Sequence, residues 1–243
     1  MSNSRATTQL ELAVLPQPDD TTCGPTCLHA VYGYYGDRLP LEDVIAEIEP
    51  LPGGGTLAVS LACHALERGY SAEIFTYNLQ VFDPTWFTSG VAIAERLERQ
   101  LAVKSDPKLS VATGNYLRFL RLGGRLRFEN LTGRMIRRTL KRETPILTGL
   151  SATYLYGCAR EYRDEYDDIR GEPTGHFVIL SGYDRERRRV RVADPLQDNP
   201  LQSGRSYEVD ADRLVGAILL GILTYDANLL LIRPRSHSAR GVV

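Results

Sequence analysis

The stretch Gln17-Pro18-Asp19-Asp20-Thr21-Thr22-Cys23-Gly24-Pro25-Thr26-Cys27 predicts a loop that runs into a helix, with a cysteine at the junction. Pro25 suits a first helical turn, because the N–H that it lacks would be unpaired there in any residue. Apolar and aromatic residues then recur at helical spacing, at Leu28, Val31, Tyr32 and Tyr35. We therefore expect a helix from about Cys23 to Tyr35.

The start of this helix gives Cys23 the chemistry of a nucleophile. The first turn of a helix carries free N–H groups and the positive end of the helix dipole, and both favour a thiolate over a thiol. Gln17 lies six residues upstream, and its amide could donate a hydrogen bond to a developing oxyanion. Alternatively, Cys23 could be a core residue, as cysteines often are, and Gln17 an ordinary surface residue.

A thiolate nucleophile needs a base, and the base needs a group that orients it. His176 opens the apolar run 175–180, and Asp194 follows the run 190–193. An imidazole beside a thiolate makes an acyl-transfer unit, and a carboxylate would hold the ring and fix its tautomer. The structural alternatives are a hydrogen-bonded core histidine and a turn aspartate before Pro195.

These motifs together resemble the papain-like cysteine peptidases, in particular the branch that removes double-glycine leader peptides from bacteriocins. The resemblance implies a papain-like fold of the α+β class. It also implies a site of four residues, with Cys23 as nucleophile, His176 as base, Asp194 orienting the imidazole and Gln17 as oxyanion donor. Thr22 stands where the bacteriocin enzymes usually have an acidic residue, and papain has Asn in place of the aspartate.

The hydrophobic periodicity agrees with an α+β fold, because helices dominate the N-terminal half and antiparallel strands the C-terminal half. The expected helices cover 23–35, 41–48, 57–68 with Thr56 as cap, 84–103, about 131–141, and 210–220. The expected strands cover 9–15, 71–77, 144–150, 176–183, 189–193, 206–209 and 229–233. A site built from the first helix and these strands would lie in the cleft between the two halves.

The composition bounds the setting of the protein. A chain of 243 residues, 43% hydrophobic and 24% charged, suits a single domain over 1–243, and its net charge of −1 gives no general attraction to nucleic acid or membranes. Four cysteines are too few for a disulfide-stapled fold. The first residues lack the apolar core of a signal peptide, and no apolar run reaches the ~20 residues of a spanning helix. We expect a stand-alone cytoplasmic domain without a membrane span, metal or organic cofactor.

Segment 151–174 breaks the periodic pattern directly before His176. It holds several tyrosines beside several acidic residues. It could be an insertion that forms a lid or a substrate-contacting loop, or it could be a surface excursion.

The stretch 118–142 is strongly basic. It could be the solvated side of a helix or a surface for an acidic partner or peptide. It lacks the interleaved aromatic residues of nucleic-acid binders, so nucleic acid is not an expected partner.

The remaining cysteines have no predicted chemistry. Cys27 lies four helical positions after Cys23, which places the two Cβ atoms ~5–6 Å apart, too far for a disulfide. We expect Cys27 to be a small core residue. Cys63 and Cys158 lack the paired spacing of a zinc site.

Three functions fit these residues. The first is a cysteine peptidase that hydrolyses a peptide or isopeptide bond of a peptide or protein substrate through an acyl-enzyme. The second is an acyl- or peptidyl-transferase, or an amidase, with the same triad. The third is a peptide-binding module of the same fold without turnover. The sequence leaves the substrate and the oligomeric state open.

Overall fold

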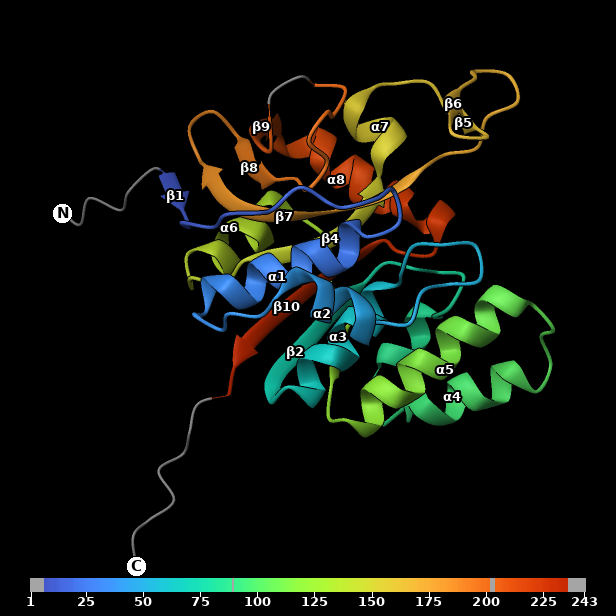
Figure 1. Cartoon of the computed structure of the whole chain (residues 1–243). Helices are drawn as coiled ribbons and strands as arrows, with labels where there is room; N and C mark the ends of the chain where they lie inside the picture. The colour runs from blue at the N-terminus through green and yellow to red at the C-terminus, as the bar shows by residue number, and fades with distance from the viewer. Residues whose placement is uncertain (1–6, 89, 202–203, 236–243) are drawn as a thin grey trace, which may run out of the picture.

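A computed structural model describes residues 7–88, 90–201 and 204–235. Its main sheet has the strand order β3-β2-β10-β4-β7-β8-β9, and β1 pairs with β7 off this path. All neighbours are antiparallel except β2 and β3. Helices cover both faces of the sheet (Figure 1).

The strands are β1 (Thr7–Gln9), β2 (Tyr70–Thr76), β3 (Arg125–Arg127), β4 (Ile146–Ser151), β5 (Glu161–Tyr162), β6 (Glu165–Tyr166), β7 (Gly175–Asp184), β8 (Arg189–Ala193), β9 (Ser206–Asp210) and β10 (Asn228–Pro234). The α-helices are α1 (Cys23–Tyr34), α2 (Leu41–Glu47), α3 (Ala58–Glu67), α4 (Ile93–Leu101), α5 (Pro107–Arg121), α6 (Gly133–Leu140), α7 (Ala152–Tyr156) and α8 (Ala211–Leu220). Two 3₁₀ helices complete the described elements, η1 (Pro84–Phe87) and η2 (Gly221–Thr224).

The central strand β7 is buried on both faces. Phe177 and Ile179 belong to the core that includes α1, α3 and α5, whereas Val178 and Leu180 belong to the core that includes α6 and α8. Successive residues of a strand point to opposite faces, so a strand between two helical layers is apolar throughout. His176 is the second residue of this buried strand.

The α+β class predicted from the sequence is confirmed, but the two halves of the chain are not separate layers. Strand β2 belongs to the N-terminal half and pairs with β10, close to the end of the chain (Figure 1). Helices α6, α7 and α8 belong to the C-terminal half and cover the second face. The sheet therefore joins both halves.

Helix α1 begins at Cys23, as predicted. The turn before it is fixed by Asp19, whose Oδ1 accepts hydrogen bonds from the N–H and the hydroxyl of Thr21, each at 2.8 Å. The hydroxyl of Thr26 donates to the carbonyl of Thr22 at 2.8 Å across the first turn. Most of α1 is buried, and it packs against β7.

Three predictions about the N-terminal half were wrong in detail, and one helix was not predicted. The expected helix 84–103 is divided into η1 and α4, and Gly90 lies between them with a φ of +84°, which a helix cannot contain. The strand expected at 9–15 is β1, Thr7–Gln9. Thr56 does not cap α3, because Leu57 is the N-cap residue and the Thr56 hydroxyl is buried without a hydrogen-bond partner among the described residues. Helix α5 was not predicted.

Segment 151–174 contains α7 and the two-stranded hairpin β5–β6. The turn residues Arg163 and Asp164 have φ values of 53° and 64°, as a tight hairpin turn requires. The hairpin and α7 lie beside the same end of β7 (Figure 1).

The basic stretch 118–142 spans the end of α5, β3 and α6, and α6 is the helix expected near 131–141. Part of its charge is neutralised within the chain. Arg118 pairs with Glu67 at 2.6 Å, and Arg127 pairs with Glu73 at 3.1 Å.

Candidate active site

Cys23 is the first residue of α1, and 8% of its surface is exposed. Its thiol lies close enough to the ring of His176 for a side-chain interaction that raises the pKa of the histidine. The structure therefore brings together two residues that are far apart in the sequence.

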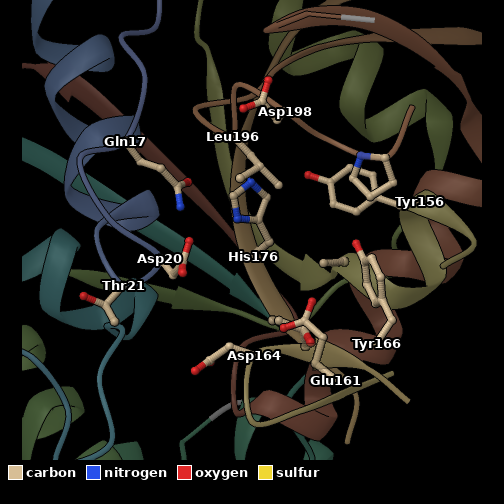
Figure 2. Close-up of a pocket in the computed structure, with 14 residues that line it drawn as sticks. Gln17, Asp20, Thr21, Tyr156, Glu161, Asp164, Tyr166, His176, Leu196 and Asp198 are labelled. Atoms are coloured by element: carbon tan, nitrogen blue, oxygen red, sulfur yellow. The ribbon is translucent and has the colours of Figure 1, made fainter. Parts of the chain in front are cut away.

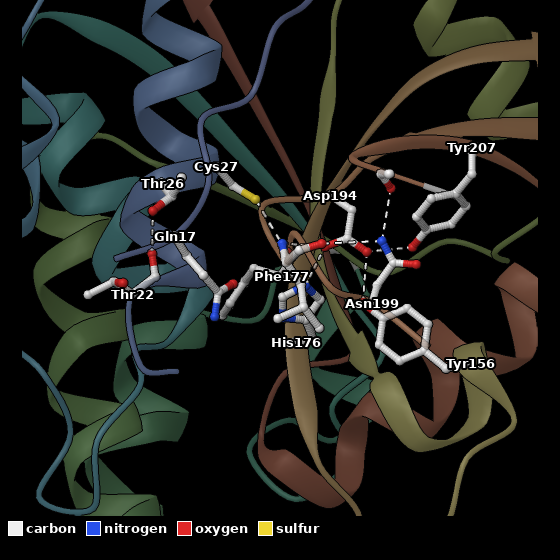
Figure 3. A network of polar contacts seen from close by, with 12 residues as sticks. Gln17, Thr22, Thr26, Cys27, Tyr156, His176, Phe177, Asp194, Asn199 and Tyr207 are labelled. Atoms are coloured by element: carbon white, nitrogen blue, oxygen red, sulfur yellow. Dashed lines mark hydrogen bonds and ion pairs between the residues drawn. The ribbon is translucent and has the colours of Figure 1, made fainter. Parts of the chain in front are cut away.

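His176 is the second residue of β7, and Asp194 directly follows β8, the neighbouring strand. The ring Nε2 lies 2.8 Å from Asp194 Oδ1 (Figure 3). Burial lowers the pKa of His176, but the hydrogen bonds and charges of Asp194 and Cys23 outweigh it and raise the pKa to about 10. Because the carboxylate accepts from Nε2, the other ring nitrogen is left to serve the thiol.

Asp194 is completely buried, and both of its carboxylate oxygens accept hydrogen bonds. Oδ2 accepts from the hydroxyls of Tyr207 at 2.6 Å and Tyr156 at 2.7 Å, and Oδ1 also accepts from the N–H of Leu196 at 2.9 Å (Figure 3). Burial raises the pKa of Asp194, but the hydrogen bonds and charge of His176 and the tyrosine hydroxyls more than reverse this effect. The aspartate is therefore ionised.

Tyr156 and Tyr207 are site residues that the sequence analysis missed. Tyr156 ends α7 within the tyrosine-rich segment 151–174, and Tyr207 belongs to β9. The only signal for Tyr156 was the position of its segment directly before His176. Tyr207 gave no signal, because a tyrosine in a strand is ordinary.

Gln17 lies in the same region and is tied to the loop that carries Asp194. Its backbone N–H donates to the carbonyl of Pro195 at 3.0 Å, and its side-chain Nε2 donates to the carbonyl of Asp19 at 3.0 Å. One amide hydrogen of Nε2 is thus left for another acceptor. Figure 2 shows the amide directed toward the space in front of His176.

An open cleft of about 450 Å³ contains Gln17 and His176 in its wall. Three segments and the start of β7 form it: the segments are the loop before α1, segment 151–174, and the loop that follows β8 (Figure 2). Segment 151–174 therefore lines the cleft.

Cys27 does not share the environment of Cys23. It is completely buried, its thiol donates to the carbonyl of Phe177 at 3.3 Å, and burial raises its pKa well above the ordinary value. The prediction of a core residue is confirmed, and all four cysteines are free.

Within residues 7–88, 90–201 and 204–235, no three His, Cys, Asp or Glu side chains are grouped so that they could hold a metal ion. In the same part of the chain, every helix is too short or too polar to span a bilayer.

A model of the Peptidase_C39 like family matches residues 106–213. The matched segment includes His176 and Asp194 and lies after Cys23 and Gln17. No curated protein matches the chain.

Solved structures of low sequence identity match almost the whole chain. A C39-like peptidase from Bacillus anthracis is 15% identical with a TM-score of 0.52, and the match covers 94% of this chain and 98% of that one. A double glycine motif protease from an AMS/PCAT transporter, solved with its leader peptide, is 14% identical with a TM-score of 0.46, covering 93% and 94%. Xylellain, a cysteine protease from Xylella fastidiosa, is 14% identical with a TM-score of 0.42, covering 94% and 85%.

The fold shared with the C39-like peptidase from Bacillus anthracis agrees with the papain-like fold expected from the sequence. The family model adds an independent match over the segment that holds the histidine and the aspartate. The family match confirms the resemblance to cysteine peptidases that the sequence indicated, and cysteine peptidase is the class of enzyme that this match supports.

Proposed function

We propose that the chain hydrolyses peptide bonds through a Cys23-His176-Asp194 triad. The observation that carries this proposal is the placement of His176 between its two partners. Its Nε2 lies 2.8 Å from Asp194, and its interaction with Cys23 helps to raise its pKa. A pKa above neutrality in the histidine favours a thiolate–imidazolium pair, which is the reactive form of such a site.

In the first step the Cys23 thiolate attacks the carbonyl carbon of the substrate, and the C=O electron pair moves onto oxygen. The resulting oxyanion would accept hydrogen bonds from the free amide hydrogen of Gln17 and from the Cys23 backbone N–H at the start of α1. Helix α1 is suited to this role because its first N–H groups have no partner within the helix. When the intermediate collapses, the C–N bond breaks and the His176 imidazolium gives its proton to the leaving amine.

In the second step the neutral imidazole takes a proton from water, and the hydroxide formed attacks the thioester carbonyl. Collapse of this second intermediate releases the carboxylic acid product and restores the thiolate–imidazolium pair. Asp194 holds the ring throughout and stabilises its charge, and Tyr156 and Tyr207 hold the carboxylate.

We further propose that residues 1–243 act as one peptidase domain in which 151–174 is an insertion that walls the cleft. The contribution of this segment to the cleft supports that role. The cytoplasmic location expected from the composition remains a prediction.

The test is cleavage of a peptide library by Cys23→Ala, with Cys27→Ser as the matched control because Cys27 is an unreactive core thiol. Mass spectrometry should detect products with the parent protein and the control, and none with Cys23→Ala. Unchanged cleavage by Cys23→Ala would remove the assignment. Product masses measured with and without an added amine separate hydrolysis from transfer, since transfer would add the mass of the amine.

A further inference from the structure

The cleft around His176 has a one-sided charge. Four carboxylate residues line it, Asp20, Glu161, Asp164 and Asp198, and among the residues that the structure describes no lysine or arginine lines it. Figure 2 shows these side chains arranged around the imidazole. The whole chain has a net charge of only −1, so the acidity of the cleft is a local property.

None of these four carboxylate groups forms an ion pair or accepts a hydrogen bond within the described parts of the chain. Carboxylates elsewhere commonly do so. Asp212 pairs with Arg188 and Glu67 with Arg118, each at 2.6 Å. Arginines thus neutralise exposed carboxylates elsewhere on the protein, but none is found among the described residues that line the cleft.

The hairpin β5–β6 separates its charges between two faces. Its register pairs Glu161 with Tyr166, and both side chains line the cleft. The second pair is Tyr162 and Glu165, and neither lines it. Directly opposed residues of an antiparallel pair share a face, and neighbouring residues point to opposite faces.

Two arginines of the segment lie with the second face. The guanidinium groups of Arg163 and Arg170 lie over the ring of Tyr162, at 5.2 Å and 4.7 Å from its centre. The hairpin thus presents a carboxylate and a tyrosine to the cleft and holds its cations away from it.

Unpaired carboxylates beside tyrosine rings are suited to bind a cationic side chain. A lysine or arginine forms charge-assisted hydrogen bonds with carboxylates and is attracted to aromatic faces such as those of Tyr156 and Tyr166. A glutamate or aspartate at the same position would be repelled. We infer that the cleft selects peptides that carry lysine or arginine close to the scissile bond. This inference depends on the proposed function, because it assumes that the bond is cleaved beside His176.

The test compares peptides of one length and one sequence that differ only in lysine, glutamine or glutamate at positions flanking the cleaved bond. We expect kcat/KM to fall in that order. The lysine advantage should shrink between 20 mM and 500 mM NaCl, since exposed charges are screened by salt.

Matched variants localise the effect. Glu161→Gln should reduce the ratio of lysine-peptide to glutamine-peptide kcat/KM by about twofold to fivefold, the size expected for one exposed ion pair. Asp164→Asn should act in the same direction. Glu165→Gln is the control, because it removes the same charge from the other face of the same hairpin, and the ratio should not change. Equal kcat/KM for lysine and glutamine peptides, or an equal loss in Glu161→Gln and Glu165→Gln, would overturn the inference.

Binding separates this inference from the proposed function. Fluorescence anisotropy with Cys23→Ala measures the affinity for the same labelled peptides without turnover. Tighter binding of the lysine peptide, reduced by Glu161→Gln in the Cys23→Ala background, supports the inference even if no Cys23-dependent cleavage is found. Equal binding of all three peptides contradicts it even if cleavage occurs.

Discussion

The hydroxyl of Tyr156 donates a hydrogen bond to Asp194 Oδ2 at 2.7 Å, and this bond joins helix α7 to the loop after β8. The hydroxyl of Tyr207 reaches the same oxygen at 2.6 Å. Burying an ionised carboxylate is costly unless hydrogen bonds replace the lost water. The two tyrosines therefore allow Asp194 to be charged and fully buried beside the imidazole that it holds.

Replacing Tyr156 by Phe should weaken the fold by about 1.5–3 kcal/mol, because a buried carboxylate loses a charge-assisted hydrogen bond. Urea unfolding at pH 7 measures the change. Tyr154→Phe in the same helix is the control, since its ring is exposed and no hydrogen bond of its hydroxyl is found within the described residues. Equal stability of the two variants would contradict the supporting role of Tyr156.

The sequence predicted the elements that carry the site because each has strong local signals. The start of α1 at Cys23 follows a loop of turn residues, and strands β7 and β8 are apolar runs joined by a charged turn. These two features were enough to nominate Cys23 and His176, with Gln17 upstream of the helix and Asp194 at the end of β8 as candidate partners. The resemblance to peptidases then gave all four residues their roles, and the choice of Asp194 rests mainly on it.

What the sequence did not predict depends on contacts between distant segments. The pairing of β2 with β10, which merges the two halves into one sheet, has no local signal. The hydroxyl contacts of Tyr156 and Tyr207 appear only when α7 and β9 meet at the aspartate. Helix α5 does have a local signal, because Asp106 suits an N-cap and Pro107 suits the first helical position. In the structure the Asp106 carboxylate accepts from the N–H of Leu109, as such a cap requires.

Stability should depend on pH through the His176-Asp194 pair. The pKa of His176 rises from 6.5 to about 10 on folding, so the stabilisation is full below pH 6.5 and is lost as the pH rises toward 10. The pKa of Asp194 is lowered from 3.8, so its contribution is present above that value and is lost as the pH falls through the lower folded value. Urea midpoints should therefore be higher at pH 5.5 than at pH 9.

Cys23→Ala supplies the control for this pH dependence. In the parent protein the Cys23 thiol helps to raise the pKa of His176. Removing the thiol should therefore move the loss of stability to lower pH. A parent protein that is equally stable at pH 5.5 and pH 9 would contradict the ion pair.

Gly24 allows α1 to lie close to Thr56, which precedes α3, and to β7. A Cβ at this position would lie 2.5 Å from Thr56 Cγ2 and 3.3 Å from Phe177 Cδ2. Gly24→Ala should therefore destabilise the protein by about 1–3 kcal/mol and lower kcat/KM, because the helix that carries Cys23 must shift. Gly33→Ala in the same helix is the control, since no atom lies within 4 Å of its Cβ and alanine favours the helix by about 0.5–1 kcal/mol. Thermal unfolding and peptide cleavage test both variants, and a neutral Gly24→Ala would show that the contact is not tight.

Substitutions of Gln17 can separate a catalytic role as oxyanion donor from a structural role in the loop before α1. The backbone N–H that ties it to Pro195 survives any side-chain change, and the side-chain bond to the Asp19 carbonyl is exposed. Gln17→Ala should therefore leave the fold and the KM nearly unchanged. Loss of an oxyanion donor should lower kcat by about 10²-fold. Gln17→Glu should lower it at least as much, because an ionised carboxylate cannot donate and would repel the developing oxyanion. Steady-state kinetics beside urea unfolding decide the matter: a wild-type kcat in Gln17→Ala, or a loss of kcat matched by a loss of stability, would exclude the oxyanion role.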